Sequence, residues 1–152
     1  MSLYLRILVA ALAALLMLAA PAACADAGDP APPTATDPNF IAAKKAIDAK
    51  EWKKAIDLLN KVRVNADVHN YLGYAYRHLG NYKEAFHNYG RALEIDPAHR
   101  GAHEYVGEAY LLTDNLPKAE EHLAALNRLC GTSCEEYRDL AREVAAYKKK
   151  RA

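Results

Sequence analysis

One stretch of the chain recurs after 34 residues, counted from Gly73 to Gly107. Residues 69–76 read HNYLGYAY and residues 103–110 read HEYVGEAY, and the agreement continues downstream. A fixed period of this length is typical of proteins built from stacked helical units, none of which can bury its apolar face alone. The period therefore predicts the architecture. It also favours binding over catalysis, because repeats of this kind rarely carry out chemistry.

Apolar residues at helical spacing indicate that each unit is a pair of helices. In the middle unit, the stripe expected to be buried on the first helix is Val68, Leu72, Ala75 and Leu79. The stripe on the second helix is Tyr82, Phe86, Tyr89 and Leu93. Tyrosines that recur at equivalent positions are expected to pack in the core: Tyr71, Tyr76, Tyr89, Tyr105 and Tyr110. The small residue Gly73 should let a neighbouring helix approach closely.

Four short signals predict where helices begin. A side-chain oxygen at the N-cap can accept a backbone N–H of the first turn, and proline fits that turn. A glutamate three residues after the cap can complete a capping box. The predicted pairs are Asp37 with Pro38, Asn81 with Glu84, Asp96 with Pro97, and Ser133 with Glu136.

The pattern resembles the tetratricopeptide repeat, whose signature is W-x2-L-G-x2-Y, then A-x3-F, then P. The middle copy has these positions filled by His69, Leu72, Gly73, Tyr76, Ala85, Tyr89 and Pro97. The next copy has His103, Val106, Gly107, Tyr110, Ala119 and Leu123. A degenerate copy upstream retains Trp52, Ala55 and Leu59. The resemblance implies an all-α fold, a right-handed superhelical stack of three hairpins (about 39–65, 66–99 and 100–131) followed by a capping helix and basic tail over 132–152.

The first 25 residues resemble a bacterial secretory signal peptide. An apolar run follows Arg6 and ends in Ala23-Cys24-Ala25, which fits the small-x-small cleavage rule. Three outcomes remain open: cleavage after Ala25, acylation of Cys24, or an uncleaved anchor that tethers the protein to the membrane. All three predict an exported protein that faces the periplasm. Residues 26–38, rich in Pro and Ala, are expected to form a disordered linker.

Charge and cysteine usage narrow the class of partner. The chain has a formal net charge of +1, so no charge excess indicates nucleic acid or a polyanionic substrate. In an oxidising compartment, Cys130 and Cys134 are expected to form a structural disulfide, with free thiols and redox or metal chemistry as the alternatives.

No pattern in the sequence indicates an enzyme. It contains no glycine-rich phosphate loop, no metalloprotease His-Glu motif and no serine nucleophile elbow. His99 and His103 are four residues apart, but packing is the preferred interpretation over a metal site. No carboxylate is expected to be paired in an apolar setting that would raise its pKa for acid–base work. We therefore expect no cofactor and no catalytic residue.

The leading interpretation is a non-enzymatic adaptor or scaffold that binds a peptide or a partner helix in a concave groove. Residues at groove positions by helical spacing, outside the expected core, are Lys44, Asp67, Asn70, Tyr74, Arg77, His78, Glu104 and Glu108. The alternatives are an assembly subunit of an envelope complex and a thiol-redox protein that uses Cys130 and Cys134. The partner's identity and the oligomeric state stay open.

Overall fold

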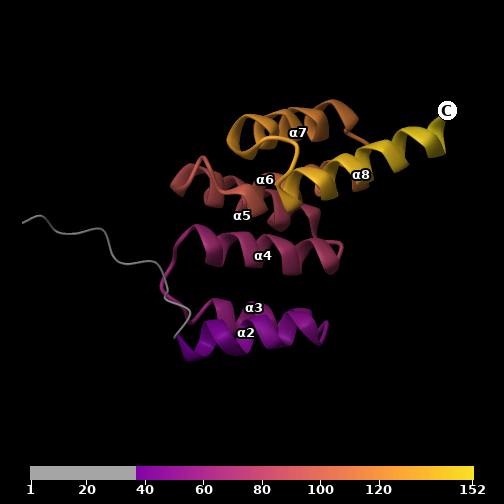
Figure 1. Cartoon of the computed structure of the whole chain (residues 1–152). Coiled ribbons are helices and arrows are strands. Elements are labelled where there is room, and N and C mark those ends of the chain that lie inside the picture. Colours follow the sequence, from indigo (N-terminus) through magenta and orange to yellow (C-terminus); the bar gives the residue numbers. More distant parts are fainter. Residues whose placement is uncertain (1–36) are drawn as a thin grey trace, which may run out of the picture. The chain divides into compact units, whose positions relative to one another are not determined.

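The computed structural model describes residues 37–152, which form seven α-helices and no β-strand within that range (Figure 1). The helices are α2 (Pro38–Asp48), α3 (Trp52–Leu59), α4 (Ala66–His78), α5 (Tyr82–Ile95), α6 (Arg100–Leu112), α7 (Leu116–Cys130) and α8 (Glu135–Arg151). The predicted signal peptide and nearly all of the predicted linker lie outside the described residues. No helix among the described residues is both long enough and apolar enough to cross a bilayer.

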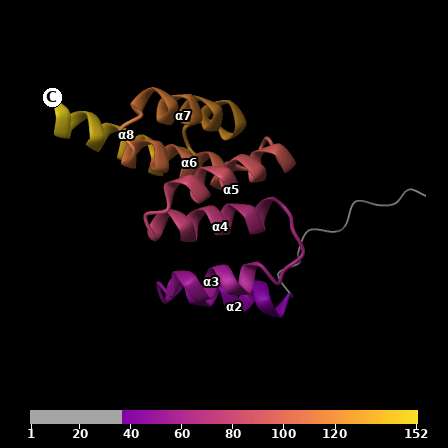
Figure 2. The same ribbon diagram turned by 180° about the vertical axis from the view of Figure 1, so that it is seen from behind.

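Consecutive helices pair into the three expected hairpins, α2 with α3, α4 with α5, and α6 with α7. Neighbouring hairpins pack on one another, and α8 packs against both α6 and α7 (Figures 1 and 2). The prediction of an all-α repeat stack closed by a final helix is confirmed.

The core follows the repeat. Tyr89 is fully buried, and it lies against Gly73, where an added Cβ would stand 2.6 Å from the Tyr89 Cε1 atom. Val68, Leu72 and Ala75 are buried as expected, whereas Leu79 is 41% exposed. The expectation for Leu79 was wrong because this residue is the C-cap of α4, where the chain already turns towards Gly80.

Two of the four predicted caps are present. The Asp37 carboxylate accepts the backbone N–H groups of Asn39 at 2.8 Å and Phe40 at 3.2 Å. The Asn81 side chain accepts the N–H of Glu84 at 3.4 Å. Both helix starts therefore lie where the sequence places them.

The predicted cap at Asp96 was wrong. The Asp96 carboxylate accepts the N–H of Ala98 at 2.9 Å and so closes a turn, which delays the helix until Arg100. The cap of α6 is His99, whose Nδ1 accepts the N–H of Ala102 at 3.1 Å.

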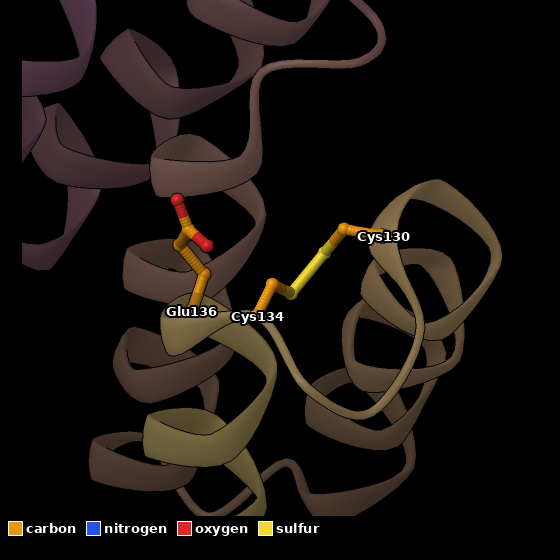
Figure 3. Close-up of side chains that lie close together, drawn as sticks. All are labelled: Cys130, Cys134 and Glu136. Atoms are coloured by element: carbon orange, nitrogen blue, oxygen red, sulfur yellow. A yellow bond between two sulfur atoms is a disulfide. The ribbon is translucent and has the colours of Figure 1, made fainter.

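The predicted cap at Ser133 was also wrong, because α8 begins one residue later with Cys134 at the N-cap. Cys134 is joined to Cys130, the last residue of α7, by a disulfide with Cα atoms 5.9 Å apart (Figure 3). Glu136, the expected capping-box partner, instead forms an ion pair with Arg100 at 3.4 Å. Although Glu136 lies near both sulfurs, they are bonded to each other, so this group offers no thiolate to a metal.

Candidate functional site: a tyrosine pocket between the first helices

The first helices of the three hairpins together line a pocket of 220 Å³. Helix α2 contributes positions 44, 47 and 48, which share one face because they are three and four residues apart. Helix α4 contributes two tyrosines by the same spacing, and α6 contributes one. We call this site the tyrosine pocket; it is lined by Lys44, Ile47, Asp48, Tyr71, Tyr74 and Tyr105.

Aromatic contacts hold Tyr74 at the centre of this pocket. Its ring centroid lies 4.9 Å from that of Tyr105 and 4.5 Å from that of His78. The His78 ring stacks on Trp52 at 4.3 Å, so the aromatic row continues into α3. Burial raises the pKa of the Tyr74 phenol, which therefore presents a neutral hydroxyl group. Tyr74 is thus an oriented anchor with little side-chain freedom left to lose on binding.

Arg77 is buried instead of lining open groove. It is only 9% exposed, and its guanidinium forms an ion pair with Glu108 of α6. Its Cζ atom lies 5.1 Å from the ring centroid of Tyr74 and 5.6 Å from that of Tyr105. Arg77 therefore connects α4 to α6 from behind the pocket, and it orients the two tyrosines by cation–π contact.

Glu104 is a buried carboxyl group in an acidic neighbourhood. It is 8% exposed, and no hydrogen bond or ion pair engages it within residues 37–152. Burial raises the pKa of Glu104 to about 8, and the charges of Glu108, Asp139 and Glu136 raise it further against the opposing effect of Arg77. The expectation that no carboxylate has such a setting was wrong.

The burial of Glu104 could have been predicted by comparing equivalent positions of the two repeats. Glu104 occupies the position of Asn70 in the preceding repeat, 34 residues earlier. Asn70 is 4% exposed because α6 covers it, with the Asn70 Nδ2 atom 3.3 Å from where a Cβ on Gly101 would stand. Helix α8 covers Glu104 in turn, since Glu136 and Asp139 face it. Because Asn70 is buried in the middle repeat, the equivalent residue Glu104 should be buried in the last one.

The remaining predicted groove residues lie around the pocket. The Lys44 ammonium is 5.9 Å from the ring centroid of Tyr71. Asp67, at the start of α4, accepts a hydrogen bond from His99 Nε2 at 3.0 Å. This bond lowers the pKa of Asp67 and raises that of His99. Asp67 therefore links two repeats and lies outside the pocket. Sequence reasoning missed the lining roles of Tyr71 and Tyr105, which were assigned to the core alone.

The histidines of the last repeat do not converge on a common centre with His99. The Nδ1 atoms of His103 and His122 are 2.9 Å apart, and the His103 Nε2–H donates to the Pro97 carbonyl at 3.1 Å. Burial, with His103 nearby, lowers the pKa of His122 to about 4. His103 therefore packs between α6 and α7, as the sequence interpretation preferred.

Comparison with known proteins fits this geometry. Residues 66–99, which contain α4 and α5, match the family model described as the tetratricopeptide repeat. No curated protein matches the chain. Together with the structural relatives below, this match supports a tetratricopeptide-repeat protein.

Two solved structures share the fold. One is the Yersinia enterocolitica type III secretion chaperone SycD in complex with a peptide of the translocator YopD, with a TM-score of 0.62 and 20% identity over 75% of this chain and 92% of that one. The other is the second TPR domain of human RPAP3 in complex with the HSP70 peptide SGPTIEEVD, with a TM-score of 0.62 and 17% identity over 72% of this chain and 92% of that one.

Proposed function

We propose that the chain is a non-enzymatic protein-interaction module, exported to the periplasm, that binds a peptide or a partner helix across its first helices. The tyrosine pocket carries the proposal. Its volume of 220 Å³ falls below the roughly 300–1,000 Å³ of pockets that enclose whole small molecules, so it suits a single side chain of a longer segment.

The chemistry of the lining supports the same conclusion. Three tyrosines and Ile47 offer apolar contact area, and Lys44 and Asp48 add one charge of each sign. Rigid aromatic anchors with a few polar groups around them are typical of protein-binding hot spots. The two structural relatives are both recorded with a bound peptide, which agrees with a role in peptide binding for this chain.

Export rests on the sequence of residues 1–25, which precede the described part of the chain. The Cys130–Cys134 disulfide agrees with export, because disulfides persist in oxidising compartments such as the bacterial periplasm. Intact mass of the protein recovered from the periplasm tests this half of the proposal. A mass that begins at Asp26 is expected, and a lipid on Cys24 or a retained N-terminus would place the protein at the membrane surface.

Affinity selection tests the groove. The full chain is immobilised and offered a pool of short randomised peptides, and mass spectrometry identifies those retained. We expect retention to fall at least about tenfold for Lys44→Glu. The new carboxylate lies beside Asp48, so it repels acidic occupants and must lose its hydration under apolar ones. Lys45→Glu is the matched control, since Lys45 is exposed on the same helix outside the pocket.

Tyr74→Ala should reduce retention still further, with its folded state checked by circular dichroism. The groove proposal fails if the wild-type chain retains no more peptide than an empty support. It also fails if Lys44→Glu and Tyr74→Ala both retain the same peptides as the wild type.

A further inference from the structure

Of the four acidic side chains where α6 packs on α8, three form an ion pair with an arginine and Glu104 does not. Glu108 has Arg77 as a partner, Glu136 has Arg100, and Asp139 has Arg142. Glu104 lies among these acids and forms no ion pair or hydrogen bond with a described residue, although the charge of Arg77 is near enough to oppose the rise in its pKa. It is therefore a mostly buried carboxyl group without an ion-pair partner among the described residues, close enough to three acids for their charges to raise its pKa.

The fold does not require an acid at this position. Asn70 fills the equivalent slot in the middle repeat, and it too is buried against the helix that follows its hairpin. Burial and the charges of three neighbouring acids disfavour an ionised carboxyl group here, a free-energy cost that a neutral amide would not have. No packing contact within the described part of the free protein compensates for this cost. The carboxyl group therefore indicates that a ligand binds at this position.

The position also fits a segment lying in the tyrosine pocket. Glu104 precedes the pocket residue Tyr105 in α6, and Glu108 follows one turn later beside Tyr74. A lysine or arginine has a long apolar stem that can cross the tyrosine rings while its charged end reaches past them. Glu104, once ionised, would pair with that end, because Arg77 is already neutralised by Glu108.

We propose that Glu104, with Glu136 and Asp139 facing it from α8, receives a lysine or arginine side chain of the segment bound in the groove. This inference rests on the proposed function, and it adds the class of partner: a peptide or helix that carries a basic residue next to the residue seated in the tyrosine pocket.

Binding of that basic side chain is coupled to a proton. Near neutral pH the free protein holds Glu104 largely protonated, because burial raises its pKa to about 8. When an ammonium or guanidinium group arrives, the carboxyl group loses its proton to the solvent and becomes the counter-ion, while the basic side chain keeps its charge. Groups that face Glu104 and contribute to this equilibrium are Arg77, Tyr105, Glu108, Glu136 and Asp139.

Four synthetic pools test the proposal on the immobilised full chain. Each pool is randomised except for one central residue, which is lysine, arginine, glutamine or norleucine. We expect the wild-type chain to retain the lysine and arginine pools at least about tenfold over the norleucine pool, as a charge-assisted hydrogen bond would give. In Glu104→Gln, that ratio should fall to near one while retention of the norleucine pool stays unchanged.

Glu94→Gln is the matched control, because it removes the same charge from an exposed position of α5 and should keep the preference. Calorimetry with a retained lysine peptide, in two buffers of different ionisation enthalpy, should show release of close to one proton. Glu104→Gln should abolish that release, which loss of a merely structural residue would not do.

The outcomes separate the two proposals. Equal retention of the lysine and norleucine pools by the wild type overturns the role of Glu104 and leaves peptide binding intact. A basic preference that survives in Glu104→Gln overturns it as well. Retention of no pool at all overturns the proposed function and this inference with it.

Discussion

The middle and last repeats have the same backbone plan but present different chemistry at equivalent positions of their first helices. The pairs, 34 residues apart, are Asn70 and Glu104, Tyr74 and Glu108, and Arg77 and Leu111. The middle repeat has an amide, an aromatic ring and a cation at these positions, of which only Tyr74 lines the tyrosine pocket, whereas the last repeat has two acids and an aliphatic side chain. The Tyr74 side of the groove is therefore suited to a large apolar contact, and the Glu104 side to a positive charge.

A second pair of equivalent slots differs on the side away from the tyrosine pocket. His69 Nδ1 lies 2.9 Å from the Asn88 Oδ1 atom, and in the next repeat His103 and His122 form the corresponding contact. The contact distance is the same although one partner has changed. The repeat therefore fixes which positions meet, and the residue types at those positions decide what the surface can bind.

The largest expected effect concerns the position that both repeats fill with glycine. A side chain at Gly73 would collide with buried Tyr89, so Gly73→Leu should lower the free energy of unfolding by more than about 3 kcal/mol. Urea unfolding measures it. Gly90→Ala is the control: apart from the adjacent backbone of α5 itself, nothing lies within 4 Å of an added Cβ there, so it should stabilise α5 by about 0.5–1 kcal/mol. An unchanged midpoint for Gly73→Leu would show that the helices can separate freely.

Exchanging one slot between the repeats should have the next largest effect. Arg77→Leu gives the middle repeat the leucine that the last repeat has at the equivalent position 111. The change also leaves Glu108 without its counter-ion. We expect a loss of about 3 kcal/mol in unfolding free energy. Adding Glu108→Gln should recover most of it. If Arg77→Leu alone unfolds at the wild-type midpoint, the ion pair does not hold α4 to α6.

The acid of the last repeat should produce a pH effect that the amide of the middle repeat cannot. The folded pKa of Glu104 lies above its unfolded value, so between about pH 5 and pH 8 the folded state binds more protons and stability falls as pH rises. Thermal midpoints of Glu104→Gln should lack this loss. Between about pH 5 and pH 8 the wild type should lose on the order of 2 kcal/mol more unfolding free energy than Glu104→Gln. This figure is reduced from the full pKa shift because the carboxyl group is in partial contact with solvent. Parallel pH profiles for the two proteins would contradict it, since their histidines are the same.

Loss of the disulfide that follows the last repeat, which the middle repeat lacks, should have the smallest effect on the free energy of unfolding. Reduction, or the double change Cys130→Ser and Cys134→Ser, should cost about 1–2 kcal/mol because the closed loop is short. Denaturant unfolding with and without reductant measures it. Thiol titration of the native oxidised protein should find no free thiol at these positions. Titratable thiols there would show that α8 is held by packing alone.

The architecture could be predicted from the sequence because period, turn and cap signals are local. The contact at Gly73 and the cap at Asp37 both follow from residues close in the chain. Burial of Asn70, Arg77 and Glu104 could not be obtained from the spacing within one helix. Helix α4 packs on its partner α5 and also on α6, and α6 packs on α7 and also on α8; those second contacts cover the flank on which these residues lie.

The two caps that were wrong have different causes. His99 begins α6 because its ring accepts a backbone N–H while its other nitrogen bonds Asp67 in the previous repeat. Cys134 begins α8 because it is joined to Cys130. A contact between repeats therefore decides the first of these helix starts, whereas the second lies beside a disulfide that spans only four residues.

Photocrosslinking tests the central claim, that the first helices form the binding face, most directly. Tyr74 is replaced by benzoylphenylalanine, a photoreactive aromatic residue, and a second protein carries it at His87, which is exposed on α5. The lysine-containing peptide pool is irradiated with each protein. We predict peptide adducts at position 74 that unlabelled competitor peptides suppress, and none above background at position 87. Equal adduct yields at the two positions, or adducts at position 87 alone, would contradict the account.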